Sequence, residues 1–164
     1  MQKDATYKAV PNTGDHRCFG CSPLNPSGLQ MQVHADEKSV LSWVTVPEHL
    51  CGWRNLVHGG VISTILDEVM GWGVIVLLKR ISLTQSMTID FLRPVTTGVP
   101  LKTEAKVLER TKEHEAVLES TLYDQQEEPC ATARGTFALL SPRLAKRMGI
   151  LDEELLEAFR PLLE

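Results

Sequence analysis

An apolar run of twenty residues, 59–78, is the strongest constraint that this sequence places on its fold. The run is long enough to cross a bilayer as a helix, but two acids, Asp67 and Glu68, stand near its middle. An ionised carboxylate is costly inside a membrane, whereas the core helix of a water-soluble domain can turn it toward water or into a cleft. The sequence therefore predicts a buried core helix and no membrane span, with the two acids as candidate site residues.

Length and charge narrow the class of protein further. A chain of 164 residues suits one compact domain with a sizeable core. Its net charge is −4 and its basic residues form no stripe, which argues against nucleic acid as a partner. The first residues contain no continuous apolar stretch of the kind found in a secretory signal, so a cytoplasmic location is expected.

Segments rich in β-forming residues flank the predicted helix. Two precede it and four follow it: 29–34, 39–46, 83–91, 101–109, 115–123 and 130–140. Several strands in succession around one apolar helix predict an α+β fold in which an antiparallel sheet covers the helix. We therefore expect an N-terminal arm over 1–28, a main domain over 29–140 and a C-terminal helical extension over 141–164. Asp152 is the expected cap of a helix that packs on the sheet or on a neighbouring subunit.

The segment 83–91 has the clearest alternation in the chain. One face of this strand carries Leu83, Gln85, Met87, Ile89 and Phe91. The other face carries Thr84, Ser86, Thr88 and Asp90. The alternation of apolar and polar positions predicts a half-buried strand, with the four polar residues together on its exposed face.

The predicted helix has two unlike faces. At about 100° per residue, one broad face collects the apolar residues Val61, Ile62, Ile65, Leu66 and Val69. Asp67 points away from that face, and its neighbours on the helix are Gly60, Ser63, Thr64 and Gly71. A water-facing stripe usually carries long charged side chains, so these small residues favour close approach by another backbone, another subunit or a ligand. Glu68 is expected to point to solvent or to form a salt bridge.

The helix begins at a His-Gly-Gly sequence, residues 58–60. Backbone N–H groups at a helix start lack acceptors within the helix, and glycine leaves them open to an approaching carbonyl, so Gly59 and Gly60 can form an oxyanion hole. Asp67 lies roughly two and a half turns further along, about 13 Å by helical rise. One small carbonyl group cannot touch both ends of that distance, so we expect the amide and the carboxylate to meet across a symmetric dimer.

The chain has four cysteines, one C-x-x-C pair and two isolated thiols: Cys18, Cys21, Cys51 and Cys130. A zinc site of the common double-pair type would need a second C-x-x-C, and the spacing of His16 and His34 fits no standard ligand pattern. We therefore expect reduced thiols in a structured turn and no metal. A metal site and a redox pair remain the alternatives for the C-x-x-C.

Several of these pieces together resemble a known family. The helix segment HGGVISTILDE (58–68), the strand LTQSMTIDFLRPV (83–95), and the upstream CFGC (18–21) and NPSGL (25–29) are similar to hotdog-fold acyl-CoA thioesterases of the phenylacetic-acid-pathway (PaaI-like) type. The resemblance covers about residues 18–140. It implies a long central helix wrapped by a curved antiparallel sheet, and subunits that associate as a dimer or tetramer with sites at their interface.

The resemblance also implies roles for individual residues. Asp67 falls at the position of the family's catalytic carboxylate, and Gly59 falls at that of the oxyanion-hole glycine. His58 matches the residue that helps to order the glycine loop. Thr84 falls ten residues before Pro94, where family members carry a Ser or Thr that helps to position the attacking water.

The activity implied by the family is hydrolysis of an acyl-CoA thioester to a free acid and CoA, with Asp67 as general base or nucleophile. CoA is part of the substrate, so no cofactor is expected. Gly60, Asn55 and the exposed Arg93 are the residues expected to contact the CoA part. One position departs from the family pattern, because many members have Asn six residues before the His, where this chain has Gly52.

Two rival functions use the same fold. A non-catalytic module would bind acyl-CoA or lipid without turnover, but binding alone does not require Asp67. A hotdog dehydratase or hydratase would need a His placed for acid and base work on the acyl chain. His58 stands in the wrong motif for that role, so the thioesterase is the leading hypothesis.

Overall fold

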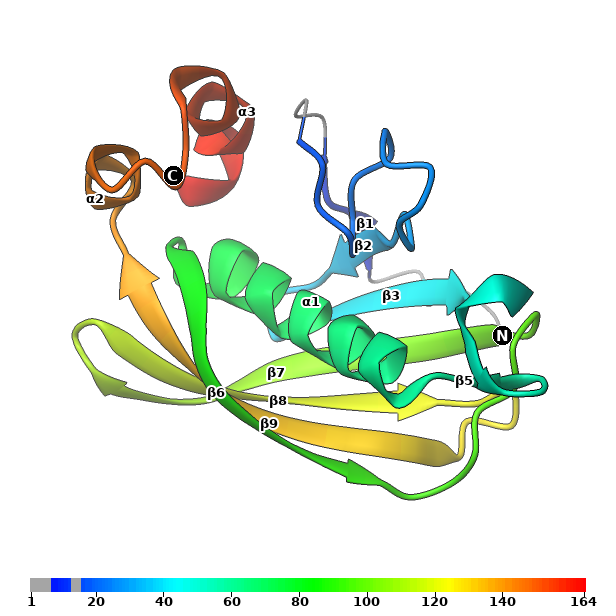
Figure 1. Ribbon diagram of the computed structural model, residues 1–164. Helices are drawn as coiled ribbons and strands as arrows, with labels where there is room; N and C mark the ends of the chain where they lie inside the picture. The colour runs from blue at the N-terminus through cyan, green and yellow to red at the C-terminus, as the bar shows by residue number, and fades with distance from the viewer. Residues whose placement is uncertain (1–6, 13–15) are drawn as a thin grey trace.

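The computed structural model describes residues 7–12 and 16–164. Within them, helix α1 (Gly59–Leu78) lies across one face of a seven-stranded antiparallel sheet that curves around it (Figure 1). The strand order is β1-β2-β3-β7-β8-β9-β6, so β6, which directly follows α1 in the chain, forms one edge. This arrangement confirms the expected α+β hotdog fold with its central helix.

All six expected strands are present. The sheet consists of β1 (Lys8–Ala9), β2 (Gln32–Ala35), β3 (Ser39–Thr45), β6 (Ile81–Phe91), β7 (Pro100–Lys112), β8 (Glu115–Tyr123) and β9 (Pro129–Leu140). The structure adds β1 and a separate small hairpin. The remaining elements are η1 (Glu48–Leu50), the hairpin strands β4 (Cys51–Trp53) and β5 (Leu56–Val57), and the helices α2 (Pro142–Arg147) and α3 (Glu153–Leu163).

His58 and Lys79 set the two ends of α1. The Nδ1 atom of His58 accepts the N–H of Gly60 at 2.9 Å and so caps the first turn. Lys79 ends the helix in the left-handed conformation, with φ 57° and ψ 43°. All the residues predicted for the apolar face are buried, as expected: Val61, Ile62, Ile65, Leu66 and Val69.

α1 is long and apolar enough to cross a membrane when judged by length and composition alone. Half of this apolar span is buried inside the protein, where α1 packs on the strands of the sheet. The sheet thereby removes the apolar side chains of the helix from water. α1 is therefore the core helix that the two acids near its middle predicted.

Two contacts hold the middle of α1 at a fixed place on β8. A Cβ atom added to Gly73 would lie 2.9 Å from Leu118 Cδ2, so the helix approaches the strand more closely than a larger residue would permit. Ser120 Oγ donates to the backbone carbonyl of Leu66 at 3.1 Å in the buried interior. An unpaired buried hydroxyl is costly, so this bond favours one position of the helix along the strand.

β6 departs from the strict alternation predicted for it. Thr84 and Ser86 are paired with adjacent residues of β9, so Gln85 between them is an extra residue that forms a β-bulge. Thr84 faces α1, whereas Ser86, Thr88 and Asp90 line a hollow on the other face of the sheet. The prediction that these four polar residues share a face is therefore wrong, because a one-residue insertion shifts the alternation by one.

The buried face predicted for this strand is only partly buried. Met87 and Ile89 pack against the edge of the core, but Leu83 and Phe91 are 41% and 56% exposed. Among the described strands, β6 has a partner on one side only, so its outer edge is unpaired there. An apolar and unpaired edge of this kind is typical of a surface that another chain covers.

The N-terminal arm and the C-terminal extension both join the main domain. β1 pairs with β2, so the arm extends the sheet. Ser141 caps α2, and Asp152 caps α3 as expected. α3 packs on α1, where the rings of Phe159 and Trp72 have centroids 5.7 Å apart. Its packing on the sheet or on a neighbouring subunit stays a prediction. The domain boundaries after residues 28 and 140 stay a prediction.

Candidate functional site

Asp67 lies near the middle of α1, on the side that faces β6. The Thr84 hydroxyl donates to Asp67 Oδ1 at 2.8 Å across the space between helix and strand. Burial raises the pKa of Asp67 above its usual range because the ionised form loses hydration, and the Thr84 hydrogen bond offsets part of this rise. A partly buried carboxylate with a raised pKa is suited to accept a proton from water or to attack a carbonyl.

Asp67 and Thr84 line a cavity of about 300 Å³. The N-terminal arm and the C-terminal extension both contribute to its wall, since segments far apart in the sequence meet beside α1. The polar lining also includes Cys18, Cys21 and Glu68, and the apolar lining includes Ile75, Leu151, Leu155 and Phe159. An acid beside an apolar wall fits a substrate that joins a polar reacting group to an apolar tail.

Gly59 provides the second candidate catalytic group after Asp67, a backbone N–H at the start of α1. The N–H of Gly60 is bonded to His58 Nδ1, and the N–H groups of Val61 and Ile62 are bonded to the His58 carbonyl. The Gly59 N–H therefore remains the one N–H of the first turn without an acceptor in the described residues. A single open amide at a helix start can stabilise negative charge on a ligand oxygen.

Gly59 lines a second cavity, a groove of about 630 Å³ beside Phe91 and Arg93. Asp67 does not line this groove, and Gly59 does not line the cavity of Asp67. The carboxylate and the open amide of one chain are therefore not brought together within that chain. The sequence spacing predicted this separation: eight residues from Gly59 to Asp67 correspond to about 12 Å along the helix axis, close to the roughly 13 Å expected from the sequence.

Arg93 is the residue expected for CoA binding that reaches the groove. Its guanidinium pairs with Glu128 at 2.9 Å, and both side chains are about half exposed. An exposed pair of this kind contributes little to stability, so the guanidinium is available to an anionic ligand. Gly52 also lines the groove. It lies close to His58 and has no side chain that could contact a ligand.

Gly60 and Asn55 are the other two residues expected to contact CoA, and that contact stays a prediction. The Gly60 N–H is occupied by the His58 ring and is not open to a ligand. Asn55 is exposed and is not part of the groove lining, and its backbone carbonyl accepts the N–H of Thr97 at 2.8 Å. Of the three residues expected to contact CoA, the structure thus brings only Arg93 beside the open amide.

Glu68 points inward, contrary to the expectation. Its Oε1 atom accepts the Trp72 Nε1–H at 3.1 Å, and its Oε2 atom accepts the Cys18 thiol at 3.4 Å. No lysine, arginine or histidine in the described part of the chain forms a salt bridge with it. Burial, followed by the nearby Cys18, raises the pKa of Glu68 to about 7. The prediction of a solvent-facing or salt-bridged side chain is wrong, because the CFGC turn folds over this side of the helix.

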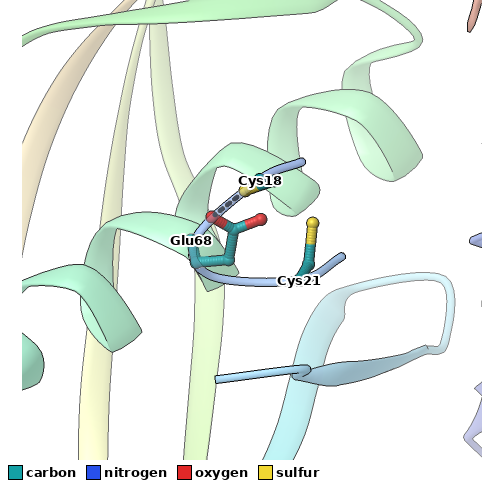
Figure 2. A group of neighbouring side chains, drawn as sticks. All are labelled: Cys18, Cys21 and Glu68. Carbon is teal, nitrogen blue, oxygen red and sulfur yellow. Dashed lines mark hydrogen bonds between the residues drawn. The ribbon is translucent and has the colours of Figure 1, made fainter. Parts of the chain in front are cut away.

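Figure 2 shows Glu68 beside the two thiols of the C-x-x-C turn. Cys18 and Cys21 are free cysteines, which agrees with the expectation of reduced thiols in a turn. Hydrogen bonding between them lowers the pKa of Cys18 to about 5 and raises the pKa of Cys21, so the pair loses one proton easily and holds the other. Glu68 is 50 residues from Cys18, and no spacing rule in the sequence connects it to the pair.

Comparison with known proteins relates this geometry to one family. A sequence model of the thioesterase superfamily matches residues 54–131, which include Gly59, Asp67 and Thr84. Verlamelin biosynthesis protein B of Lecanicillium sp is 24% identical over 129 residues, covering 62% of this chain and 56% of that protein. The chain thus spans little more than half the length of this curated relative.

Solved structures share the same fold. The PaaI protein of E. coli, from the phenylacetic acid degradation operon, superposes with a TM-score of 0.63 at 23% identity, over 69% of this chain and 81% of that one. The smu.793 protein of Streptococcus mutans UA159, bound to acetyl CoA, gives a TM-score of 0.65 at 20% identity, over 77% of this chain and 94% of that one. At these identities the likeness shows a common arrangement of helix and sheet.

Proposed function

We propose that this chain, whose residues 54–131 match the thioesterase superfamily and which has the hotdog fold, hydrolyses acyl-CoA thioesters to a free acid and CoA. The observation that carries the proposal is Asp67, a partly buried acid with a raised pKa that is held by Thr84 beside an apolar cavity. The acetyl CoA bound to the smu.793 protein supports CoA thioesters as the substrate class. The reaction takes place in the cytoplasm and needs no separate cofactor, since CoA arrives as part of the substrate.

The active site forms between two subunits. Asp67 of one subunit faces the thioester carbon, and the partner subunit's Gly59 donates its open N–H to the carbonyl oxygen. The exposed apolar side chains at the free edge of β6, Leu83 and Phe91, support this association because edge-to-edge pairing would cover them. The assembly is a dimer or a pair of dimers.

Negative charge develops on the carbonyl oxygen when a nucleophile adds to the thioester carbon. An N–H group fixed at a helix start stabilises that charge without reorganisation. The groove beside Gly59 also contains Arg93, whose half-exposed guanidinium is placed to meet a phosphate of CoA. His58 acts on the loop by keeping the Gly60 N–H occupied, so that the turn keeps the Gly59 N–H outward.

Asp67 can act by two routes. As a general base it takes a proton from water while the water oxygen bonds to the carbonyl carbon; the C–S bond then breaks, and the CoA thiolate receives that proton. As a nucleophile it displaces the CoA thiolate directly to give a mixed anhydride, which water then hydrolyses. Single-turnover hydrolysis in ¹⁸O-labelled water separates the general-base route from a nucleophilic route in which water attacks the Asp67 carbonyl carbon of the anhydride. The general-base route labels the product acid in the first turnover, whereas the nucleophilic route puts that label on Asp67 and releases unlabelled acid.

Replacement of Asp67 by Asn tests the function. We expect kcat for release of free thiol from a panel of aliphatic and aromatic acyl-CoAs to fall at least about a hundredfold, with an unchanged circular dichroism spectrum. Asp90→Asn is the matched control, because Asp90 is exposed on the far face of β6. Saturable acyl-CoA binding by the wild-type protein with no thiol release would overturn the proposal and indicate a binding module.

A further inference from the structure

We propose a metal site in which Cys18, Cys21 and Glu68 bind a thiophilic divalent cation, with Zn²⁺ as the best match. The two sulfur atoms and a carboxylate oxygen all lie within 4.8 Å of one another (Figure 2). Bonds of about 2.0–2.3 Å from a central zinc ion would span such a triangle with small side-chain movements. The site does not depend on the proposed hydrolysis.

The turn that carries the two thiols is built to sit on Glu68. A Cβ atom added to Gly20 would lie 2.3 Å from Glu68 Oε2, so only glycine lets the turn approach the carboxylate this closely. The Met31 N–H donates to the Gly20 carbonyl at 3.0 Å, and Asn12 Nδ2 donates to the Cys21 carbonyl at 2.7 Å. These hydrogen bonds therefore hold the turn, with its two thiols, in a fixed position against α1.

Among the residues that the structure describes, no salt bridge balances the charge of Glu68 in this cluster. Glu68 is largely buried, and it accepts hydrogen bonds from the Trp72 indole and the Cys18 thiol. A buried carboxylate beside two thiols is costly when ionised unless a cation pairs with it. A divalent cation between the three groups supplies that charge and accounts for their convergence from segments 50 residues apart.

The donor set selects the class of metal. Two thiolates prefer zinc or another thiophilic ion, whereas Ca²⁺ and Mg²⁺ require sites made of oxygen ligands. Two sulfurs and one carboxylate leave the fourth tetrahedral position of zinc open. All three ligands line the same cavity as Asp67, so a water on the open position would lie within that cavity.

The metal content of the full chain tests the site. Protein prepared under reducing conditions with Zn²⁺ and then desalted should retain about one zinc per chain by elemental analysis. After chelation, titration with Co²⁺ should produce sulfur-to-cobalt charge-transfer absorption with the same stoichiometry. Less than about one tenth of a zinc per chain, with no such absorption, would overturn the site.

Variants then locate the ligands. Cys18→Ser, Cys21→Ser and Glu68→Gln should each raise the dissociation constant for zinc at least about tenfold, and Cys51→Ser, an exposed thiol elsewhere, should not. Equal zinc binding by the three ligand variants and the control would overturn the assignment. So would a Cys18–Cys21 disulfide that persists in reductant, detected by mass spectrometry. Each readout is metal content, so an inactive protein that binds zinc refutes only the hydrolysis.

Discussion

Thr84 and Asp67 face each other across the gap between β6 and α1, and the Thr84 hydroxyl donates to Asp67 Oδ1 at 2.8 Å. The bulge at Gln85 places Thr84 on the helix side of the strand. The hydrogen bond favours the ionised carboxylate, whereas burial favours the neutral acid. The pair therefore sets the pH above which Asp67 is available as a base.

Thr84→Val should shift the acidic limb of the pH profile of kcat/KM to higher pH. Loss of the hydroxyl removes an interaction that lowers the pKa of Asp67, so burial raises that pKa further and less of the acid is ionised at low pH. A hydrogen bond to a charged group predicts a loss of up to about tenfold on the acidic side. Above the limb the loss should be smaller.

Thr84→Ser is the matched control, since serine keeps a hydroxyl at the same position. We expect its acidic limb to stay near that of the wild type. If the valine and serine variants shift equally, the Thr84 hydroxyl does not set the pH dependence of the reaction. Measuring the thermal unfolding of both variants distinguishes a general loss of folded structure from a shift in the pH profile.

Mixed oligomers should reveal whether Asp67 and Gly59 act from different subunits. Gly59→Pro removes the open N–H, and proline is tolerated here because position 59 begins the helix and His58 is already extended, with ψ 137°. Asp67→Asn removes the acid. Each variant alone should lose at least about a hundredfold in kcat. After unfolding and refolding an equal mixture, about a quarter of wild-type activity should return, because half of the dimers are hybrids with one intact site.

Gly59→Ala is the control for the proline variant. It adds a Cβ atom in ordinary contact with Phe91, 3.6 Å away, but keeps the N–H, so it should retain most of the activity. If the mixture of Asp67→Asn and Gly59→Pro subunits recovers no activity while refolded wild type does, both groups act within one subunit and the intersubunit site is refuted.

The course of α1 could be predicted from local sequence because its signals are local. A polar cap at His58, branched apolar residues at helical spacing and two glycines at the start act over a few residues. The same holds for the Asp152 cap of α3. The separation of Asp67 from Gly59 also followed from helix geometry alone.

Other features depend on tertiary contacts and left no local signal. The alternation around Gln85 shows no mark of a bulge, yet the bulge decides which of the neighbouring threonine and serine side chains reaches Asp67. Glu68 was expected in solvent because its burial comes from the CFGC turn, which is distant in sequence. The turn contains a glycine at position 20, but its role becomes visible only when Glu68 is placed beneath it.

Glu68→Gln should stabilise the metal-free protein at alkaline pH. The folded protein raises the pKa of Glu68 from 4.5 to about 7, so its protonated form contributes stability that is complete below pH 4.5 and is lost as the pH rises through about 7. Glutamine resembles the protonated acid and avoids that loss. We expect Tm of the variant in chelator to exceed that of wild type by a few degrees near pH 8, with little difference near pH 4.

Added Zn²⁺ should reverse this order. The wild-type protein should gain stability with zinc concentration, and the glutamine variant should gain much less because it lacks a ligand. Glu119→Gln, an exposed acid on β8, is the control and should show neither effect. Equal Tm values for Glu68→Gln and wild type at every pH would show that ionisation of buried Glu68 does not destabilise the folded protein.

Two glycines of α1, Gly71 and Gly73, should respond differently to replacement by alanine. Alanine is favoured over glycine within a helix by about 1 kcal/mol, and the gain applies to both positions. A Cβ atom at Gly71 meets Ser82 Oγ at 3.8 Å, an ordinary contact, so Gly71→Ala should raise the free energy of unfolding by up to about 1 kcal/mol. At Gly73 the Cβ atom would lie 2.9 Å from the buried Leu118 side chain, and overpacking costs about 1–3 kcal/mol, so Gly73→Ala should be neutral or destabilising. Urea unfolding of both variants measures the difference, and a more stable Gly73→Ala would show that β8 yields easily beneath the helix.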